Sequence, residues 1–220
     1  MTYGEPIALR QLELEQATSG ATTEVCESRT RAEAEFIERL KRGEAPAFEQ
    51  LVNERSGEIY GLLFRLTESG EEARDLTQET FLRAFQNISR FRGEADLRTW
   101  IYRIAINQAR NRWRWWRRRR KDATVSLDAA NNQTGQSLIT TLAESGNNPE
   151  QQTLAHERES ALVSALQRLG RAYRETVILR DIEGFSYEEI ATTLGINIGT
   201  VKSRLARGRQ ELREKLEGSL

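Results

Sequence analysis

Cysteine and histidine are almost absent from this sequence of 220 residues, which contains one of each, Cys26 and His156. A single cysteine excludes an internal disulfide and a cysteine-based zinc site. The histidine lies in a polar stretch, where a surface position is expected. The sequence also has no Gly-Lys-Ser/Thr phosphate loop and no cluster of metal ligands. We therefore predict a protein that is not an enzyme, with no catalytic residue, metal site or cofactor.

Long apolar runs are missing as well. No stretch approaches the roughly 18 apolar residues that span a bilayer. The N-terminus lacks the basic start and the apolar core of a signal peptide. These absences predict a cytoplasmic chain without membrane insertion.

The composition indicates small helical units with thin cores, because 38% of the residues are hydrophobic and 30% are charged. Apolar residues recur at helical spacing in two separate regions. We predict an all-α fold with two small helical domains joined by a flexible linker, the second a four-helix domain with a helix-turn-helix. The predicted segments are a polar, disordered leader (residues 1–33), a first domain (34–121), the linker (122–149) and a second domain (150–220).

The net charge of zero hides a basic stretch from Arg98 to Lys121. This stretch contains ten of the 33 basic residues, no acidic residue and all four tryptophans. Basic side chains neutralise phosphates, and flat aromatic rings can stack on unpaired bases. The alternative is a solvated basic face, but such a face usually mixes both signs of charge. The pattern therefore favours a surface for nucleic acid with exposed bases.

The helical period divides this basic stretch into two faces. One face is predicted to pack inward and contains Leu97, Ile101, Ile104, Ala105 and Gln108. The opposite face is predicted to point outward and contains Arg103, Asn107, Arg110, Arg114 and Arg117.

A second amphipathic helix is predicted over residues 71–88, with Ser69 as its N-cap and Glu72 at the third position. Its predicted inward residues are Ala73, Leu76, Thr80 and Ala84. The residues left for the outer face are Asp75, Gln78, Glu79, Arg83 and part of Phe81 and Phe85.

The last region has the pattern of a helix-turn-helix. Ser186 and Glu189 form a predicted capping box, Gly195 ends that short helix, and Asn197 caps the next one. A short helix, a tight turn and a basic helix are typical of DNA-binding modules. The predicted buried stripe of the last helix is Val201, Leu205, Leu212 and Leu216.

Three segments together resemble one family. They read DLTQETFLRAF (75–85), FRGEADLRTWIYRIAINQARN (91–111) and ETVILRDIEGFSYEEIATTLGINIGTVKSRLARGRQELREKL (175–216). They are similar to extracytoplasmic-function sigma factors of the sigma-70 family, over roughly residues 34–120 and 150–217. The resemblance implies a protein that binds core RNA polymerase, recognises a promoter and helps to open the duplex.

The resemblance also implies roles for individual residues and for partners. The expected partners are the clamp of the largest polymerase subunit, the flap of the second-largest subunit, promoter DNA and an anti-sigma factor. Expected polymerase contacts are Asp75, Gln78, Glu79, Phe81 and Phe85. Expected minus-ten contacts are Phe91, Arg92, Arg103, Asn107, Arg110, Asn111 and Arg114, with Asn107 reading a base flipped out of the duplex. Expected minus-thirty-five contacts are Thr200, Lys202, Ser203, Arg204 and Arg207.

Two other functions fit parts of the pattern. A helix-turn-helix regulator that acts without polymerase would need neither the DLTQETFLRAF helix nor the Asn107 position. An RNA-binding or ribosome-associated protein could use the segment rich in arginine and tryptophan.

Overall fold

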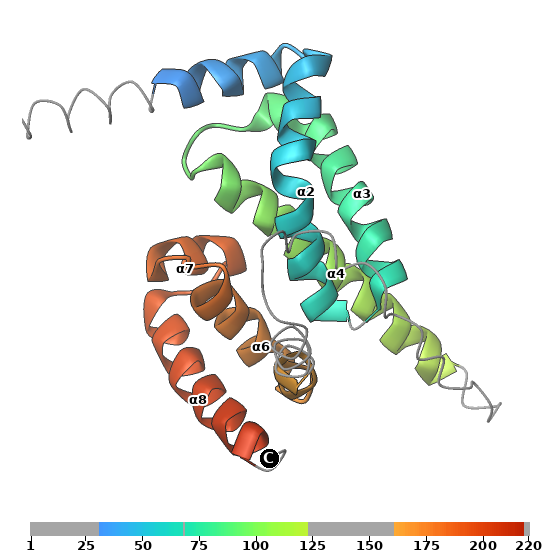
Figure 1. The fold of residues 1–220 in the computed structure, drawn as a ribbon, viewed down its shortest axis with the longest axis vertical. Coiled ribbons are helices and arrows are strands. Elements are labelled where there is room, and N and C mark those ends of the chain that lie inside the picture. Colours follow the sequence, from blue (N-terminus) through green and yellow to red (C-terminus); the bar gives the residue numbers. More distant parts are fainter. Residues whose placement is uncertain (1–30, 68, 123–160, 218–220) are drawn as a thin grey trace, which may run out of the picture. The chain divides into compact units, whose positions relative to one another are not determined.

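The computed structural model describes residues 31–67, 69–122 and 161–217, and every regular element among them is a helix or a helical turn (Figure 1). The all-α prediction is confirmed. Most of the predicted leader and of the predicted linker lies outside the described residues. Residues 31–33, which we assigned to the leader, are already helical. The chain divides into two compact units, Met1–Gln50 and Leu51–Leu220.

The described part of the first unit begins with a helix over residues 31–41. Gly43 follows it with a φ of 76°, a left-handed conformation that ends the helix. Glu44 accepts hydrogen bonds from Arg42 and Arg39, which together lower the pKa of this carboxyl. Helix α2 (Ala45–Thr67) then begins, with Pro46 in its first turn, where its fixed φ suits a helix start.

In the second unit, α3 (Gly70–Asn87) leads through the short 3-10 turn η1 (Ile88–Arg90) to α4 (Leu97–Asp122). The predicted cap is present, because the Ser69 side chain accepts from the Glu72 N–H at 3.2 Å. Asp96 accepts from the Arg98 N–H at 2.8 Å and caps α4. Helices α3 and α4 pack against each other. The four predicted inward residues of α3, Ala73, Leu76, Thr80 and Ala84, are all buried.

The second unit continues with a helix over residues 161–167, then α6 (Arg171–Val177) and the π-helical turn η2 (Ile178–Ile182). Helix α7 (Tyr187–Leu194) starts at the predicted capping box of Ser186 and Glu189. It ends at Gly195 with a φ of 67°. Helix α8 (Ile198–Glu217) follows after this turn, capped by Asn197. The predicted helix-turn-helix is therefore α7 and α8.

The buried stripe of α8 differs in part from the prediction. Val201 and Leu205 are buried, but Leu212 and Leu216 are only half-buried. Gly208 is the third buried residue, and the sequence pattern did not indicate it. A Cβ atom at position 208 would lie 2.8 Å from Val177 Cγ2 and 3.1 Å from Tyr173 Cβ. The absence of a side chain at Gly208 is what allows α8 to approach α6 this closely.

We expect Gly208→Ala to lower the free energy of unfolding by about 1–2 kcal/mol. The steric cost of overpacking against the stiff Val177 side chain exceeds the gain of about 1 kcal/mol in helix propensity. Gly61→Ala in α2 is the matched control, since its new Cβ would meet only the flexible end of Arg65. That substitution should raise stability. Denaturant unfolding of both variants checks this, and equal stabilisation by the two would contradict the packing argument.

Candidate nucleic-acid and protein interface

Helix α4 is buried on two sides. The predicted inward face packs on α3, with Leu97, Ile101, Ala105 and Gln108 buried and Ile104 half-buried. Helix α7 contacts α4 as well. Tyr102, Ile106 and Ala109 are therefore also buried, which the helical period did not predict. The surface left to solvent before the last turns of α4 is a narrow stripe, formed by Arg103, Asn107, Asn111 and Arg114.

Tyr102 lies at the centre of the second buried side. Its ring packs 4.8 Å from that of Phe185, and its hydroxyl donates to a Glu183 carboxylate oxygen at 2.7 Å. Arg98 donates to the backbone carbonyl of Glu183 at 2.8 Å. Burial, reinforced by the Glu183 carboxylate, raises the pKa of Tyr102 well above its ordinary value. The hydroxyl therefore remains a donor to this carboxylate at neutral pH.

Arg110 does not point outward, so the predicted orientation is wrong for this residue. Its guanidinium pairs with the Glu175 carboxylate at 2.6 Å, and Arg171 pairs with the same carboxylate at 2.8 Å. The side chain of Glu175 is only 4% exposed. A carboxylate removed from water in this way requires cations close by. Glu175 lies far along the chain from Arg110, so helical spacing could not show the pairing.

Asn107 and Arg103 are exposed, as predicted. Among the described residues, no carboxylate lies within ion-pair distance of Arg103. Asn111 and Arg114 are exposed too, and the Arg114 guanidinium donates to the Asn111 side-chain oxygen. This stripe presents amide groups between cations, a combination that can hold a phosphate backbone and read the edge of a base.

The loop before α4 has a buried and an exposed part. Phe91 is buried, with its ring 5.3 Å from that of the half-buried Trp100. Trp100 thus packs against the loop. Arg92 is exposed, with its guanidinium 3.8 Å from the Glu94 carboxylate. Phe91 therefore supports the loop from within, and Arg92 is the side chain accessible to a ligand.

The outer face of α3 carries acidic, amide and apolar groups. Asp75, Gln78 and Phe85 are exposed as predicted, and Glu79 pairs with Arg83 at 2.6 Å. Phe81 is only 8% exposed, so the expectation that part of its ring lies on this face is wrong. Leu82, which the sequence analysis did not single out, is 52% exposed and adds to the apolar area beside Phe85.

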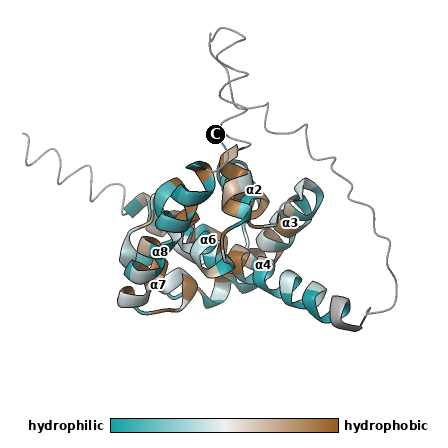
Figure 2. Cartoon of the chain, turned by 90° about the horizontal axis from the view of Figure 1, so that it is seen from below, coloured by the Kyte–Doolittle hydropathy of each residue, from teal (hydrophilic) through white to brown (hydrophobic). Residues whose placement is uncertain are grey.

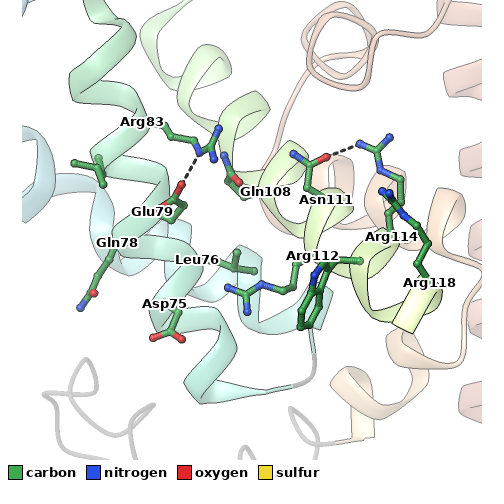
Figure 3. A pocket seen from close by; sticks show the side chains of 12 residues that line it. Asp75, Leu76, Gln78, Glu79, Arg83, Gln108, Asn111, Arg112, Arg114 and Arg118 are labelled. Carbon is green, nitrogen blue, oxygen red and sulfur yellow. Dashed lines mark hydrogen bonds and ion pairs between the residues drawn. The ribbon is translucent and has the colours of Figure 1, made fainter. Parts of the chain in front are cut away.

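A groove with a volume of about 920 Å³ lies between α3 and the second half of α4 (Figure 3). One wall carries the acidic and amide side chains of α3, and the other carries the arginines of α4. The residues that define the two walls are Asp75, Gln78, Glu79 and Arg83 on α3 and Asn111, Arg114 and Arg118 on α4. Arg83 is paired with Glu79, so the α3 wall keeps the negative charge of Asp75 opposite the arginines of α4.

The predicted reading face of α8 is accessible. Lys202, Ser203 and Arg207 are exposed, while Thr200 and Arg204 are half-buried. The Thr200 hydroxyl donates to the Asn197 side chain at 2.9 Å, and the Ser203 hydroxyl donates to the Thr200 carbonyl at 3.0 Å. These bonds fix the start of α8. Lys202 and Arg207 follow in its next turns.

Among the described residues, no group of three or more His, Cys, Asp or Glu side chains is placed to hold a metal ion. No described helix is long and apolar enough to cross a membrane.

Comparisons with known proteins match this arrangement of elements. The family description "Sigma-70 region 2" matches residues 51–121, and "Sigma-70, region 4" matches residues 159–212. The chain is 35% identical to the RNA polymerase sigma-H factor of Pseudomonas aeruginosa over 183 residues, which cover 83% of this chain and 93% of that protein. It is 33% identical to the ECF RNA polymerase sigma-E factor of Haemophilus influenzae over 182 residues, 83% of this chain and 94% of that one.

Solved structures show the same fold. The sigma factor RpoE, in complex with the anti-sigma factor NepR from Bartonella quintana, matches with a TM-score of 0.59 at 27% identity. The match covers 77% of this chain and 96% of that one. CnrH, in complex with the cytosolic domain of CnrY, matches with a TM-score of 0.61 at 22% identity and supports the fold alone. That match covers 86% of this chain and 99% of that one.

We expect Glu175→Ala to lower the free energy of unfolding by about 1–3 kcal/mol, because Arg110 and Arg171 would lose the carboxylate that compensates them. The range is reduced from that of a fully buried pair, since both arginines are partly exposed. Asp181→Ala, which removes an exposed carboxylate paired with Arg209, is the control and should cost about 0–1 kcal/mol. Denaturant unfolding compares them, and an equal small loss for both would show that the Glu175 pairs contribute little.

Proposed function

Because this chain belongs to the extracytoplasmic-function branch of the sigma-70 family of RNA polymerase sigma factors, we propose that it binds core RNA polymerase, directs it to specific promoters and helps to open the minus-ten region. Sigma factors act in transcription initiation, and we assign this chain no catalytic residue. The proposed place of action is the cytoplasm, where core polymerase works.

The observation that carries the proposal is the exposure of Asn107 on a helix that is buried on two other sides. A side-chain amide offers a donor and an acceptor, which together can read the Watson–Crick edge of a base. That edge is accessible only when the base has left the stack. Arg103 and Arg114 lie on the same stripe and can hold the backbone of the separated strand. Buried packing on both flanks keeps the helix rigid beneath these side chains.

Upstream recognition is proposed for α8. Arg207 is exposed on its outer face and can donate two hydrogen bonds to a guanine in the major groove. Lys202 is exposed one turn earlier and suits a phosphate contact. Unlike several arginines of this unit, Arg207 is not paired with a carboxylate among the described residues.

Docking on core polymerase is proposed for the outer face of α3. Asp75 and Gln78 supply polar contacts, and Leu82 and Phe85 supply exposed apolar area of the kind found at protein interfaces. The family implies the clamp of the largest subunit as the partner of this face and the flap of the second-largest subunit as a partner of the C-terminal helices. An anti-sigma factor is the proposed regulator, since RpoE from Bartonella quintana was solved with one bound.

The two alternative functions are less well supported. A regulator that acts without polymerase would not need an exposed mixed face on α3 in addition to its helix-turn-helix. An RNA-binding protein would not need the helix-turn-helix domain that matches region 4 over residues 159–212.

We expect replacement of both Asp75 and Gln78 by Ala to weaken binding to core polymerase by about tenfold or more, because both side chains are exposed on the proposed docking face. Folding should be unaffected. The charge-matched control replaces an exposed amide and an exposed acid on α2, Asn53 and Glu54, by Ala. Co-purification with core polymerase and titration of its affinity measure the effect. Undiminished affinity in the Asp75/Gln78 variant would remove this face from the proposed interface.

We expect Asn107→Ala to spare core binding and to lower open-complex formation, with a loss of about 1–3 kcal/mol of discrimination at one base, the size of a good bidentate contact. Arg103→Gln should instead weaken all templates alike, since a phosphate contact carries no sequence information. The measurement is holoenzyme binding to bubble templates that differ at each single unpaired base. Unchanged base preference in the Asn107 variant would leave α4 as a phosphate clamp without a base reader.

A further inference from the structure

The last two turns of α4 carry a surface that the functions above use only at Arg114. We call residues 113–119 the Arg-Trp extension. All seven residues are exposed, and the three tryptophans Trp113, Trp115 and Trp116 are 47%, 44% and 48% exposed. In Figure 2, this end of α4 is teal with paler bands and shows no brown. Exposed tryptophans among unbroken positive charge are costly to maintain on a surface without a partner.

The arginines of the extension have no carboxylate partner in the part of the chain that the structure describes: none lies within ion-pair distance of Arg117, Arg118 or Arg119. Other arginines of the same unit are paired, including Arg65 and Arg98 with Glu183 and Arg110 with Glu175. A run of neighbouring uncompensated charges therefore lies at this end of α4, which indicates an anionic partner there.

Two of the tryptophan rings hold two of these arginines, Arg117 and Arg119. The Arg119 guanidinium lies 4.5 Å from the centre of the Trp115 ring, and that of Arg117 lies 5.3 Å from the centre of the Trp113 ring. Stacking uses the flat face of a guanidinium and leaves the N–H groups along its edge available for a phosphate. The Trp116 ring is also engaged in contacts within the protein. It packs against the Trp115 ring at 4.9 Å in a T-shaped arrangement, and its indole N–H donates to Glu72. A base that stacked on the ring face covered by Arg117 or Arg119 would have to displace that arginine.

We propose that the Arg-Trp extension binds the phosphates of the duplex that flanks the opened minus-ten region, and that Trp113 and Trp115 position Arg117 and Arg119 for this contact. The inference rests on the proposed function. A duplex fits better than a single strand, because it has about one charge per 1.7 Å of its axis, and because the rings that would stack on single-stranded bases are occupied.

The spacing along α4 is consistent with two adjacent subsites. Arg119 lies twelve residues after Asn107. At a rise of about 1.5 Å per residue, the two side chains originate about 18 Å apart along the helix. This distance corresponds to roughly five base pairs at about 3.4 Å each. One rigid helix can therefore contact an extruded base and, with its other end, the paired DNA beside it.

The test uses holoenzyme reconstituted from core polymerase and the full chain, with either a bubble template that has duplex arms or the unpaired strand alone as an oligonucleotide. The variant replaces Arg117 and Arg119 by Gln. The charge-matched control replaces Arg42 and Arg55 by Gln, both of which pair with nearby glutamates. The slope of log affinity against log salt concentration should fall in magnitude by about 2 on the armed template, at about 0.9 per phosphate contact. It should be unchanged on the single strand and in the control.

A second pair of variants tests the positioning role of the rings. Trp115→Ala should reduce affinity for the armed template and leave the affinity for the single strand unchanged. Trp115→Phe should restore most of the loss, because a phenyl ring still supports a guanidinium. If Trp115→Ala instead weakens single-strand binding while the arginine variant does not, the rings are stacking platforms and the proposal is wrong.

Two further outcomes would overturn the proposal. An unchanged salt slope in the arginine variant on the armed template removes the duplex contact. Loss of core polymerase binding, with DNA binding per holoenzyme unchanged, assigns the extension to an acidic protein surface. Failure of the proposed function is distinguishable, since the wild-type chain would then not form a promoter-binding holoenzyme at all, and Asn107→Ala in parallel would not alter base preference.

Discussion

Helix α4 has to bury two sides and still leave a third side for a ligand, and the rest of the described second unit is arranged around that constraint. Packing on α3 uses Ile101 and Ala105, and packing on α7 and the turn before it uses Tyr102. Little of the helix circumference remains. The stripe from Arg103 through Asn107 to Arg114 is therefore narrow, and a helix held on both flanks can present a single amide with little freedom to move.

The same constraint decides which arginines are available to a partner. Glu175 and Glu183 have side chains that are 4% and 8% exposed, and a carboxylate so far from water must be compensated by nearby cations. Arg98 and Arg110 are used in this way. The exposed arginines of α4, such as Arg103 and Arg114, are left without carboxylates among the described residues. Burial of two acids thus separates one basic helix into structural arginines and arginines that can bind an anion, a division that net charge does not reveal.

Local features of this fold were predictable because they depend on neighbouring residues. The Ser69 cap, the capping box at Ser186 and the left-handed Gly195 all follow from short-range hydrogen bonding and backbone sterics. The errors concern residues whose orientation or packing depends on a segment far away in the sequence. Helical spacing placed Arg110 on the outward face. That prediction failed because its partner, Glu175, comes from another helix. Gly208 was missed because only the approach of α6 makes a side chain at that position unfavourable.

The two proposed base readers, Asn107 and Arg207, supply specificity, and the unpaired arginines supply affinity. A single base contact by Asn107 or Arg207 supplies about 1–3 kcal/mol of discrimination, too little to select a promoter alone. Both readers belong to one chain, so once one of them is bound, the other meets its element at a high effective concentration. Unpaired arginines then add affinity that depends on salt but not on sequence. In this division, a few side chains select the site, and the uncompensated charge of α4 determines how long the complex persists at a given ionic strength.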